Sequence, residues 1–223
     1  MIAVIFAVPQ ESRGFRRALG EVARFGDRGW LQGRLGAEEI VVVHTGIGAA
    51  AAEREVHALL AETQPEWLLS AGFAGGLEAR VTCGTVFVAE NFSDPGLAAR
   101  CPALPRWILT TQAEATATPE KKSALAAATG AQAVDMETAA IVRAAGGRPV
   151  LAVRAISDGV EDPLPVPLTV AYDLGAQRPR PLAVAGYMVR HPGAILPFWR
   201  FLGHLSAAEK ALQQALLSVF AAS

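Results

Sequence analysis

The stretch IAVIFAV, residues 2–8, decides the fold class of this chain. It is almost entirely apolar and ends at Pro9, a pattern typical of a strand that is buried on both faces within a parallel sheet. Similar short apolar runs recur along the chain, at Ile40–His44, Trp67–Ser70, Thr85–Ala89 and Pro149–Arg154. The sequence therefore predicts a buried and largely parallel sheet.

Helical patterns separate these apolar runs. They cover Glu11–Leu19, Gly48–Ala61, Pro119–Ala128 and Asp135–Ala145. Strands that alternate with helices predict an α/β fold, here a three-layer α/β/α sandwich with a central mixed, largely parallel sheet. Ligands of such folds usually bind beyond the carboxyl ends of the strands, so the site is expected there.

Composition narrows the class of protein. With 223 residues and 52% hydrophobic residues, the chain can bury the core of one domain, and its net charge of −1 offers no basic field for nucleic acid. Cys83 and Cys101 are far apart and the four histidines are scattered, so we expect neither a disulfide scaffold nor a metal site. The start of the chain lacks a basic signal region and no apolar run reaches membrane-spanning length, which predicts a cytoplasmic protein.

The C-terminal part differs in composition from the rest. Residues 160–181 are rich in proline, which predicts an extended surface loop that can act as a lid. Ser206 to Glu209 form a capping box that predicts the start of a final helix with one apolar stripe: Leu212, Ala215, Leu216 and Val219. We therefore expect a catalytic domain over residues 1–160, with a loop and helical tail over 161–223 packed on the same domain.

Two segments place acidic residues at the ends of apolar elements. AVDMETAA, residues 133–140, contains Glu137, and VRAISD, residues 153–158, ends in Asp158. An ionised carboxylate away from water is costly unless it is paired, hydrogen-bonded or protonated, so such positions indicate chemistry. Asp135 is equally well explained as a helix cap.

Two glycine-rich turns follow buried runs. TGIG, residues 45–48, opens a helix, and its glycines let backbone N–H groups approach an anion or a ribose. AGFAGGL, residues 71–77, closes another run and predicts a pocket wall at Gly72 and Ala74. Phe73 either offers a ring on which a base stacks or belongs to the core.

These motifs, in this order, resemble the nucleoside phosphorylase and nucleosidase superfamily, which includes purine nucleoside phosphorylase and methylthioadenosine/S-adenosylhomocysteine nucleosidase. The resemblance spans about residues 1–160. It implies that Asp158 donates a proton to N7 of a purine and that Ser157 orients Asp158. It also implies that Glu137 and Met136 hold the ribose, and that Glu11 activates water. For Asp158 to act as an acid near neutral pH, burial or a hydrogen bond must raise its pKa.

The nucleophile stays open between water and phosphate. Phosphate needs arginine, hydroxyl or backbone N–H donors, and Arg13, Gly46 and Gly48 are the candidates. Arg13 is equally well explained as a surface residue. Donors that phosphorylases of this superfamily carry near the second glycine turn are missing here, where the chain has Ser70 and Phe73, so the sequence favours water. No cofactor is expected, apart from phosphate as a co-substrate.

The tail from Tyr172 to Leu202 resembles that of the hopanoid-associated phosphorylases, which implies removal of adenine from adenosylhopane in hopanoid biosynthesis. Its aromatic residues alternate with Arg190, Arg200 and His204, so the tail either meets a membrane surface that holds a lipid-linked substrate or packs on the protein. The superfamily resemblance also implies a homodimer or larger homo-oligomer.

Other functions remain open. Within the superfamily, methylthioadenosine/S-adenosylhomocysteine nucleosidase and futalosine hydrolase are alternatives. A nucleoside-binding protein without turnover is a different class, and the pair Asp158 and Glu11 argues against it. A Rossmann dehydrogenase is disfavoured because Ala51 stands at the third glycine position of its motif.

Overall fold

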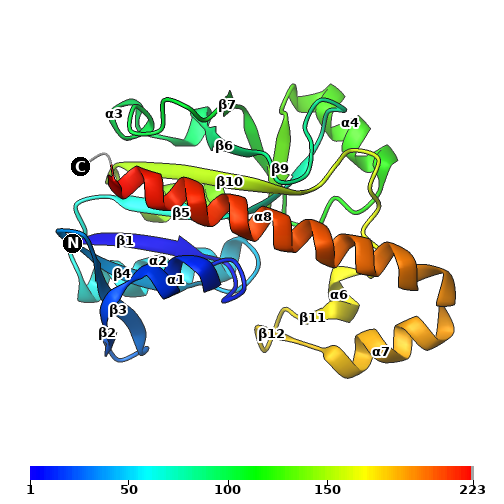
Figure 1. The fold of residues 1–223 in the computed structure, drawn as a ribbon, viewed down its shortest axis with the longest axis horizontal. Helices are drawn as coiled ribbons and strands as arrows, with labels where there is room; N and C mark the ends of the chain where they lie inside the picture. The colour runs from blue at the N-terminus through cyan, green and yellow to red at the C-terminus, as the bar shows by residue number, and fades with distance from the viewer. Residues whose placement is uncertain (222–223) are drawn as a thin grey trace.

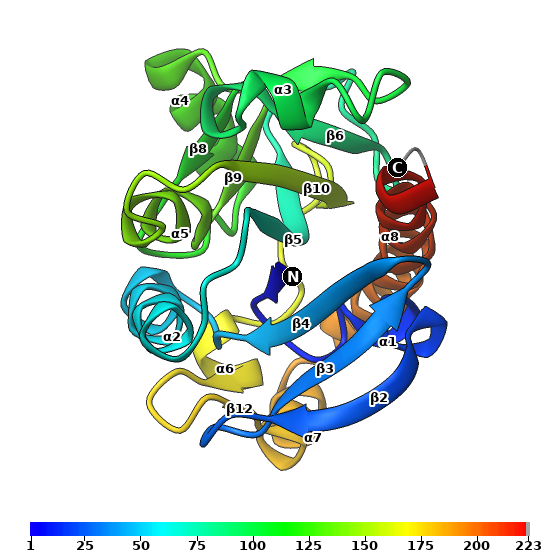
Figure 2. The same ribbon diagram turned by 90° about the vertical axis from the view of Figure 1, so that its left-hand side faces the viewer.

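The computed structural model describes residues 1–221 and contains one ten-stranded sheet with helices on both faces (Figures 1 and 2). The strand order is β2-β3-β4-β1-β5-β10-β6-β7, with β9 paired to β5 and β8 paired to β9. The strands are β1 (Ile2–Phe6), β2 (Gly20–Phe25), β3 (Trp30–Leu35), β4 (Glu38–His44), β5 (Leu68–Gly76), β6 (Val86–Ala89), β7 (Arg106–Trp107), β8 (Leu109–Thr111), β9 (Ala133–Asp135) and β10 (Val150–Asp158).

The helices and the small second sheet complete the chain. The helices are α1 (Arg13–Ala18), α2 (Ala49–Glu62), α3 (Pro95–Ala98), α4 (Pro119–Thr129), α5 (Thr138–Ala144), α6 (Leu168–Ala171), α7 (Pro181–Arg190) and α8 (Ile195–Ala221), with 3-10 turns η1 (Glu90–Phe92) and η2 (Pro192–Ala194). Strands β11 (Tyr172–Asp173) and β12 (Arg178–Pro179) form a separate antiparallel pair. Within residues 1–221, no helix has the length and apolar character needed to cross a membrane.

The centre of the sheet is parallel, as the apolar runs predict. Strand β1 lies parallel to β4 and β5, and β5 lies parallel to β10. Their residues are almost all buried, because α2 and α5 cover one face and α1 and α8 cover the other (Figure 2). The predicted three-layer fold class is therefore confirmed.

The sequence analysis did not predict several short strands. The hairpin of β2 and β3 extends the sheet antiparallel to β4, and nearly all of β2 is exposed. An exposed edge strand needs no apolar residues, so its sequence carries no burial pattern. Strands β7, β8 and β9 have two or three residues each, too few for a pattern to be recognised.

The predicted boundaries of the C-terminal loop and of the final helix were wrong. The proline-rich segment contains helix α6 and strands β11 and β12, and α8 begins at Ile195, so Ser206 lies inside a helix rather than at its start. Pro197 falls in the first turn of α8, where an N–H has no intrahelical acceptor, so proline does not prevent the earlier start. The predicted apolar stripe is buried, and α8 packs across β10 and against α1 (Figure 1).

Candidate active site

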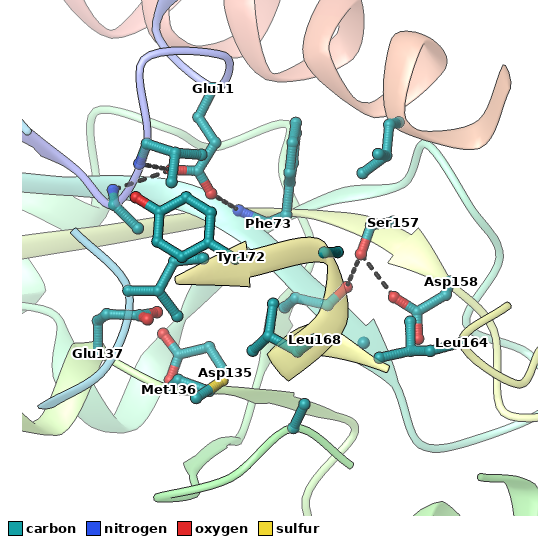
Figure 3. A pocket seen from close by; sticks show the side chains of 18 of the residues that line it. Glu11, Phe73, Asp135, Met136, Glu137, Ser157, Asp158, Leu164, Leu168 and Tyr172 are labelled. Carbon is teal, nitrogen blue, oxygen red and sulfur yellow. Dashed lines mark hydrogen bonds between the residues drawn. The ribbon is translucent and has the colours of Figure 1, made fainter. Parts of the chain in front are cut away.

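One cavity of about 610 Å³ opens at the carboxyl ends of β1, β5 and β10. Its floor comes from the sheet and from the start of α5, and its cover comes from the segment after β10 together with α8 (Figure 3). Glu11 and Glu137 lie at one end of the pocket, whereas Asp158 lies at the other. The sequence-predicted residues that line it are Glu11, Phe73, Ala74, Met136, Glu137, Ser157 and Asp158.

Glu11 lies in the turn after β1, just before α1 begins at Arg13. Its Oε2 accepts the N–H groups of Ala7 at 2.9 Å and Val8 at 3.0 Å, and its Oε1 accepts the N–H of Phe73 at 2.9 Å. Burial raises the pKa of Glu11 above its ordinary value, and these N–H groups together with the Arg154 charge offset part of the rise. Glu11 is thus a fixed carboxyl group whose proton affinity is increased, which suits a general base.

Glu137 occupies the position before the first residue of α5. Its Oε1 accepts the N–H of Gly48 at 2.7 Å, so this bond joins α5 to the first glycine turn. Burial, with the neighbouring Asp135 charge, raises the pKa of Glu137. Gly48 has a φ of 98°, a conformation that favours glycine, and the N–H group that was predicted to bind an anion donates instead to this carboxyl group.

Ser157 and Asp158 both line the cavity because β10 is irregular at its end. The register with β5 shifts between Ile156 and Asp158, and such a bulge breaks the alternation that would send adjacent side chains to opposite faces. The Ser157 hydroxyl donates to Asp158 Oδ1 at 2.6 Å. On the other side, Asp158 Oδ2 accepts from Lys122 Nζ at 2.5 Å, a partner that the sequence analysis did not identify.

A fully buried ion pair supports the floor. Arg154 Nε lies 3.1 Å from Asp135 Oδ2, and its other nitrogens donate to Ser70 Oγ at 2.8 Å, Thr138 Oγ1 at 2.6 Å and backbone carbonyls. Asp135 also accepts from Thr111 Oγ1 at 2.7 Å and from the N–H and hydroxyl of Thr138. Asp135 therefore fixes the start of α5, as a cap would, and at the same time neutralises a buried arginine.

Gln177, in the turn between β11 and β12, attaches the cover of the cavity to the first glycine turn. Gln177 Oε1 accepts the N–H of Ile47 at 2.7 Å, and Nε2 donates to the carbonyl of Ile47 at 3.2 Å. Tyr172 lies between Glu11 and Glu137 in Figure 3. The remaining cover is apolar and includes Leu164, Leu168, Ala171, Pro179, Phe201 and Leu205.

Four predicted site residues lie outside the lining of this cavity: Arg13, Gly46, Gly48 and Gly72. Arg13 is exposed and does not line the cavity, and the N–H of Gly46 donates to the carbonyl of Ala7. Gly72 lies behind Glu11, where a Cβ atom would come within 2.8 Å of Glu11 Oε1. Gly72 thus leaves room for the Glu11 carboxyl group, and it lines a small pocket beside Glu11 and Glu137.

The sequence analysis did not single out several residues that line the cavity or lie buried beside it: Lys122, Arg154, Tyr172, Gln177 and Glu114. A lysine on a short helix is normally interpreted as a surface residue. The neighbouring sequence does not distinguish Lys122 from Lys121, which is exposed. An Arg inside an apolar strand was a usable signal for Arg154, because a buried guanidinium requires a buried partner.

Comparison with known proteins agrees with this architecture. Residues 1–107 match the family model described as the phosphorylase superfamily. The Streptococcus pneumoniae MTA/SAH nucleosidase, solved with 8-aminoadenine, is similar at 23% identity over 100% of this chain and 99% of that one, with a TM-score of 0.75.

Two further solved structures share the fold. The Colwellia psychrerythraea MTA/SAH nucleosidase in complex with adenine has 19% identity over 99% of this chain and 94% of that one, with a TM-score of 0.75. The Helicobacter pylori futalosine hydrolase has 16% identity over 99% of this chain and 97% of that one, also with a TM-score of 0.75. The chain thus matches the family's sequence pattern over residues 1–107, and it shares the fold of these solved structures over nearly all of its length.

Proposed function

We propose that this protein cleaves the N-glycosidic bond of a purine nucleoside, with adenine as the base. The observation that carries the proposal is the placement of Glu11 and Asp158 at opposite ends of one cavity, with Glu137 beside Glu11 (Figure 3). Breaking an N-glycosidic bond builds positive charge on the sugar and negative charge on the departing base. A carboxylate on the sugar side of the bond can stabilise the positive charge, and a carboxylic acid on the base side can protonate the departing base.

The proposed roles follow from this geometry. Asp158 protonates N7 of the base, and Ser157 orients Asp158 through its 2.6 Å hydrogen bond. Glu137 binds the ribose hydroxyls with the oxygen that Gly48 leaves unoccupied, beside Met136. Phe73 stacks on the base, and Glu11 takes a proton from the nucleophile. The solved relatives with adenine and 8-aminoadenine support adenine as the base.

Water is the proposed nucleophile. Among the described residues, the cavity lining contains no lysine or arginine. The N–H groups of the first glycine turn are also taken, because Gly46, Ile47 and Gly48 donate to Ala7, Gln177 and Glu137 respectively. A phosphate ion needs converging donors, and a charged oxygen without them loses several kcal/mol of stabilisation. These contacts support hydrolysis over phosphorolysis.

The substrate's 5′ group is proposed to be bulky and apolar. The cover brings the apolar side chains of Leu168, Phe201 and Leu205 to the cavity, where they can contact such a group. Adenosylhopane, the substrate implied by the tail, fits this description. Methylthioadenosine, S-adenosylhomocysteine and futalosine remain the alternatives, and the solved relatives support those smaller substrates.

The test is release of free base. We would incubate the pure protein with adenosine, methylthioadenosine, S-adenosylhomocysteine, futalosine and adenosylhopane, with and without phosphate, and measure free base by chromatography. Release from adenosylhopane alone, independent of phosphate, is the expected result. Rapid cleavage of methylthioadenosine would assign a salvage nucleosidase, and dependence on phosphate would overturn the hydrolytic step. Binding without release from any nucleoside would assign a non-catalytic nucleoside-binding protein.

The C-terminal helices support a proposed contact with a lipid surface, from which a cytoplasmic enzyme would take a lipid-linked substrate. Leu182 and Val189 of α7 are 88% and 83% exposed, and Leu196 and Trp199 of α8 are 60% and 66% exposed. Between Asp173 and Glu209 the chain carries four arginines and no acidic residue. Exposed apolar side chains beside basic ones suit an anionic membrane surface.

Vesicle sedimentation tests this contact without any enzyme assay. The protein is expected to sediment with phosphatidylglycerol vesicles and much less with phosphatidylcholine vesicles. The double variant Leu196→Ser/Trp199→Ser should lose sedimentation, whereas Val22→Ser, which changes an exposed apolar residue of β2, should keep it. Equal sedimentation of both variants would contradict the assignment of this surface. The proposed homodimer is tested separately by light scattering, where a monomeric mass would contradict it.

A further inference from the structure

Lys122 is fully buried, at 0% exposure, in the first half of α4. Lysine is almost never buried completely unless its charge is paired. Lys122 does not line the cavity, whereas Asp158 does, so Asp158 lies between Lys122 and the cavity. This position is unexplained by packing alone, because an apolar side chain would fill the same space without desolvating a charge.

The ammonium group of Lys122 has an acceptor for each of its three protons. Nζ lies 2.5 Å from Asp158 Oδ2, 2.6 Å from the carbonyl oxygen of Gly159 and 2.9 Å from the carbonyl oxygen of Asp162. An ammonium group has three donors and no acceptor, so this set of partners selects the charged form. Asp158 Oδ1 accepts from Ser157, so both oxygens of the carboxylate accept hydrogen bonds.

The Asp158 carboxyl group donates neither of these hydrogen bonds, because Oδ1 accepts from Ser157 and Oδ2 accepts from Lys122. The proposed reaction nevertheless requires Asp158 to give a proton to the base. The short contact between Nζ and Oδ2 supplies the missing path, because a proton that crosses it converts the ion pair into a neutral amine and a neutral carboxylic acid.

We propose that Lys122 is a positioning residue that supplies, through Asp158, the proton that the departing purine receives; this rests on the proposed function. The proton moves from Nζ to Oδ2 and from the Asp158 carboxyl group to N7. The bond between N9 and C1′ breaks with its electrons on the base, and the oxygen of water bonds to C1′ as Glu11 takes a water proton. Exchange with solvent then returns a proton to Lys122 and removes one from Glu11.

Two other titratable groups lie beside the pair. The Asp162 carboxylate accepts the N–H of Gly159 at 2.9 Å, and the Cys83 thiol lies 3.5 Å from the carbonyl oxygen of Ser157. Burial raises the pKa of the Cys83 thiol, and the charges of Asp158 and Asp162 raise it further, so the thiol stays neutral. Lys122 is therefore the cation that faces Asp158 among these groups.

The pH profile distinguishes a proton source from a merely structural lysine. An ammonium group beside a carboxylate keeps its proton into the alkaline range, whereas a lone carboxylic acid loses its proton several pH units earlier. Wild-type kcat/KM for the nucleoside should therefore persist at alkaline pH. In Lys122→Met the transferable proton sits on Asp158 alone, and the alkaline limb should move to lower pH, with a loss of about 100-fold at pH 8.5 and a much smaller loss at pH 5.5.

A second substrate separates proton supply from folding. 4-Nitrophenyl ribofuranoside has a leaving group that departs without protonation, so Lys122→Met should cleave it at nearly the wild-type rate. Lys121→Met, which changes the exposed neighbour on α4, should leave both substrates and the pH profile unchanged. If circular dichroism shows that Lys122→Met does not fold, Lys122→Gln, which keeps donors for the two carbonyl oxygens, replaces it.

Each outcome decides the inference. An alkaline limb in the same place for wild type and Lys122→Met, or equal losses on both substrates, would overturn the role of Lys122 and leave the proposed function intact. A wild-type protein that released no base from any nucleoside would overturn the proposed function, and this inference with it.

Discussion

The carboxyl group of Glu11 accepts a 2.9 Å hydrogen bond from the backbone N–H of Phe73, a residue 62 positions further along the chain. The bond joins the turn after β1 to the end of β5, and Gly72 leaves the space that it needs. One wall of the cavity therefore has a carboxyl group in a single orientation. A fixed orientation of this kind is what a group that activates a nucleophile requires.

Replacement of Glu11 by Gln keeps the shape of the side chain and removes its basicity. We expect kcat to fall by about 10³-fold, within the range of general base catalysis, while nucleoside binding by calorimetry changes little. Glu90→Gln, at an exposed position, is the matched control. Because burial raises the pKa of Glu11 and a base must be unprotonated, wild-type kcat/KM should already decline above pH 4.5 as the solution is acidified. Full activity of Glu11→Gln would remove Glu11 from the mechanism.

Replacement of Asp158 by Asn should abolish release of adenine, because an amide cannot pass a proton to N7. The variant should still fold, since the amide oxygen can accept from Lys122 in place of the carboxylate oxygen. Release of base and thermal unfolding are measured together, with Asp27→Asn at an exposed position as the control. Turnover at the wild-type rate would show that another group is the acid.

Arg154→Met breaks the buried pair with Asp135 and leaves a carboxylate without its cation. The expected loss in the free energy of unfolding is about 3–5 kcal/mol, because the uncompensated charge stays buried. Denaturant unfolding measures it, and Arg143→Met, which removes an exposed arginine of α5, should change the free energy by less than about 0.5 kcal/mol. A similarly small change in the free energy of unfolding for both variants would mean that water solvates the Asp135 carboxylate once its cation is removed.

Gln177→Ala releases the cover from the first glycine turn. The two lost hydrogen bonds to Ile47 should raise KM by about 30-fold, on the basis of roughly 1 kcal/mol for each hydrogen bond, and leave kcat nearly unchanged. Steady-state kinetics on the preferred nucleoside tests this. Gln214→Ala, at an exposed position of α8, should behave as wild type. A fall in kcat with constant KM would instead place Gln177 in the chemical step.

His44 makes stability depend on pH. Burial and the charge of Arg16 lower its pKa from 6.5 to about 4 in the folded protein. Between these pH values the unfolded chain binds a proton that the folded protein does not, so acidification favours unfolding. The cost reaches about 3 kcal/mol below pH 4 and vanishes above pH 6.5. His44→Gln, whose amide can still bond Ser12, should lose less stability between pH 7 and pH 4.5; an equal loss would assign the acid sensitivity to other groups.

The sequence alone was sufficient for the central sheet and for most of the cavity. Runs such as Ile2–Phe6 are buried on both faces, so they must be apolar throughout, and this leaves a pattern that needs no partner to be recognised. The ends of these runs mark one edge of a parallel sheet, which brings Glu11, Glu137 and Asp158 to one cavity. Exposed elements such as β2 leave no such pattern and were missed.

Only the tertiary structure decided which of these groups are partners. Lys122 and Asp158 are 36 positions apart, and Arg154 and Asp135 are 19 apart, and each pair exists because two separate elements pack together. The cover over the cavity is likewise fixed by contacts of Gln177 with a turn 130 positions away. Local sequence records the burial pattern of each element, whereas the charge state of a buried group depends on neighbours that only folding supplies.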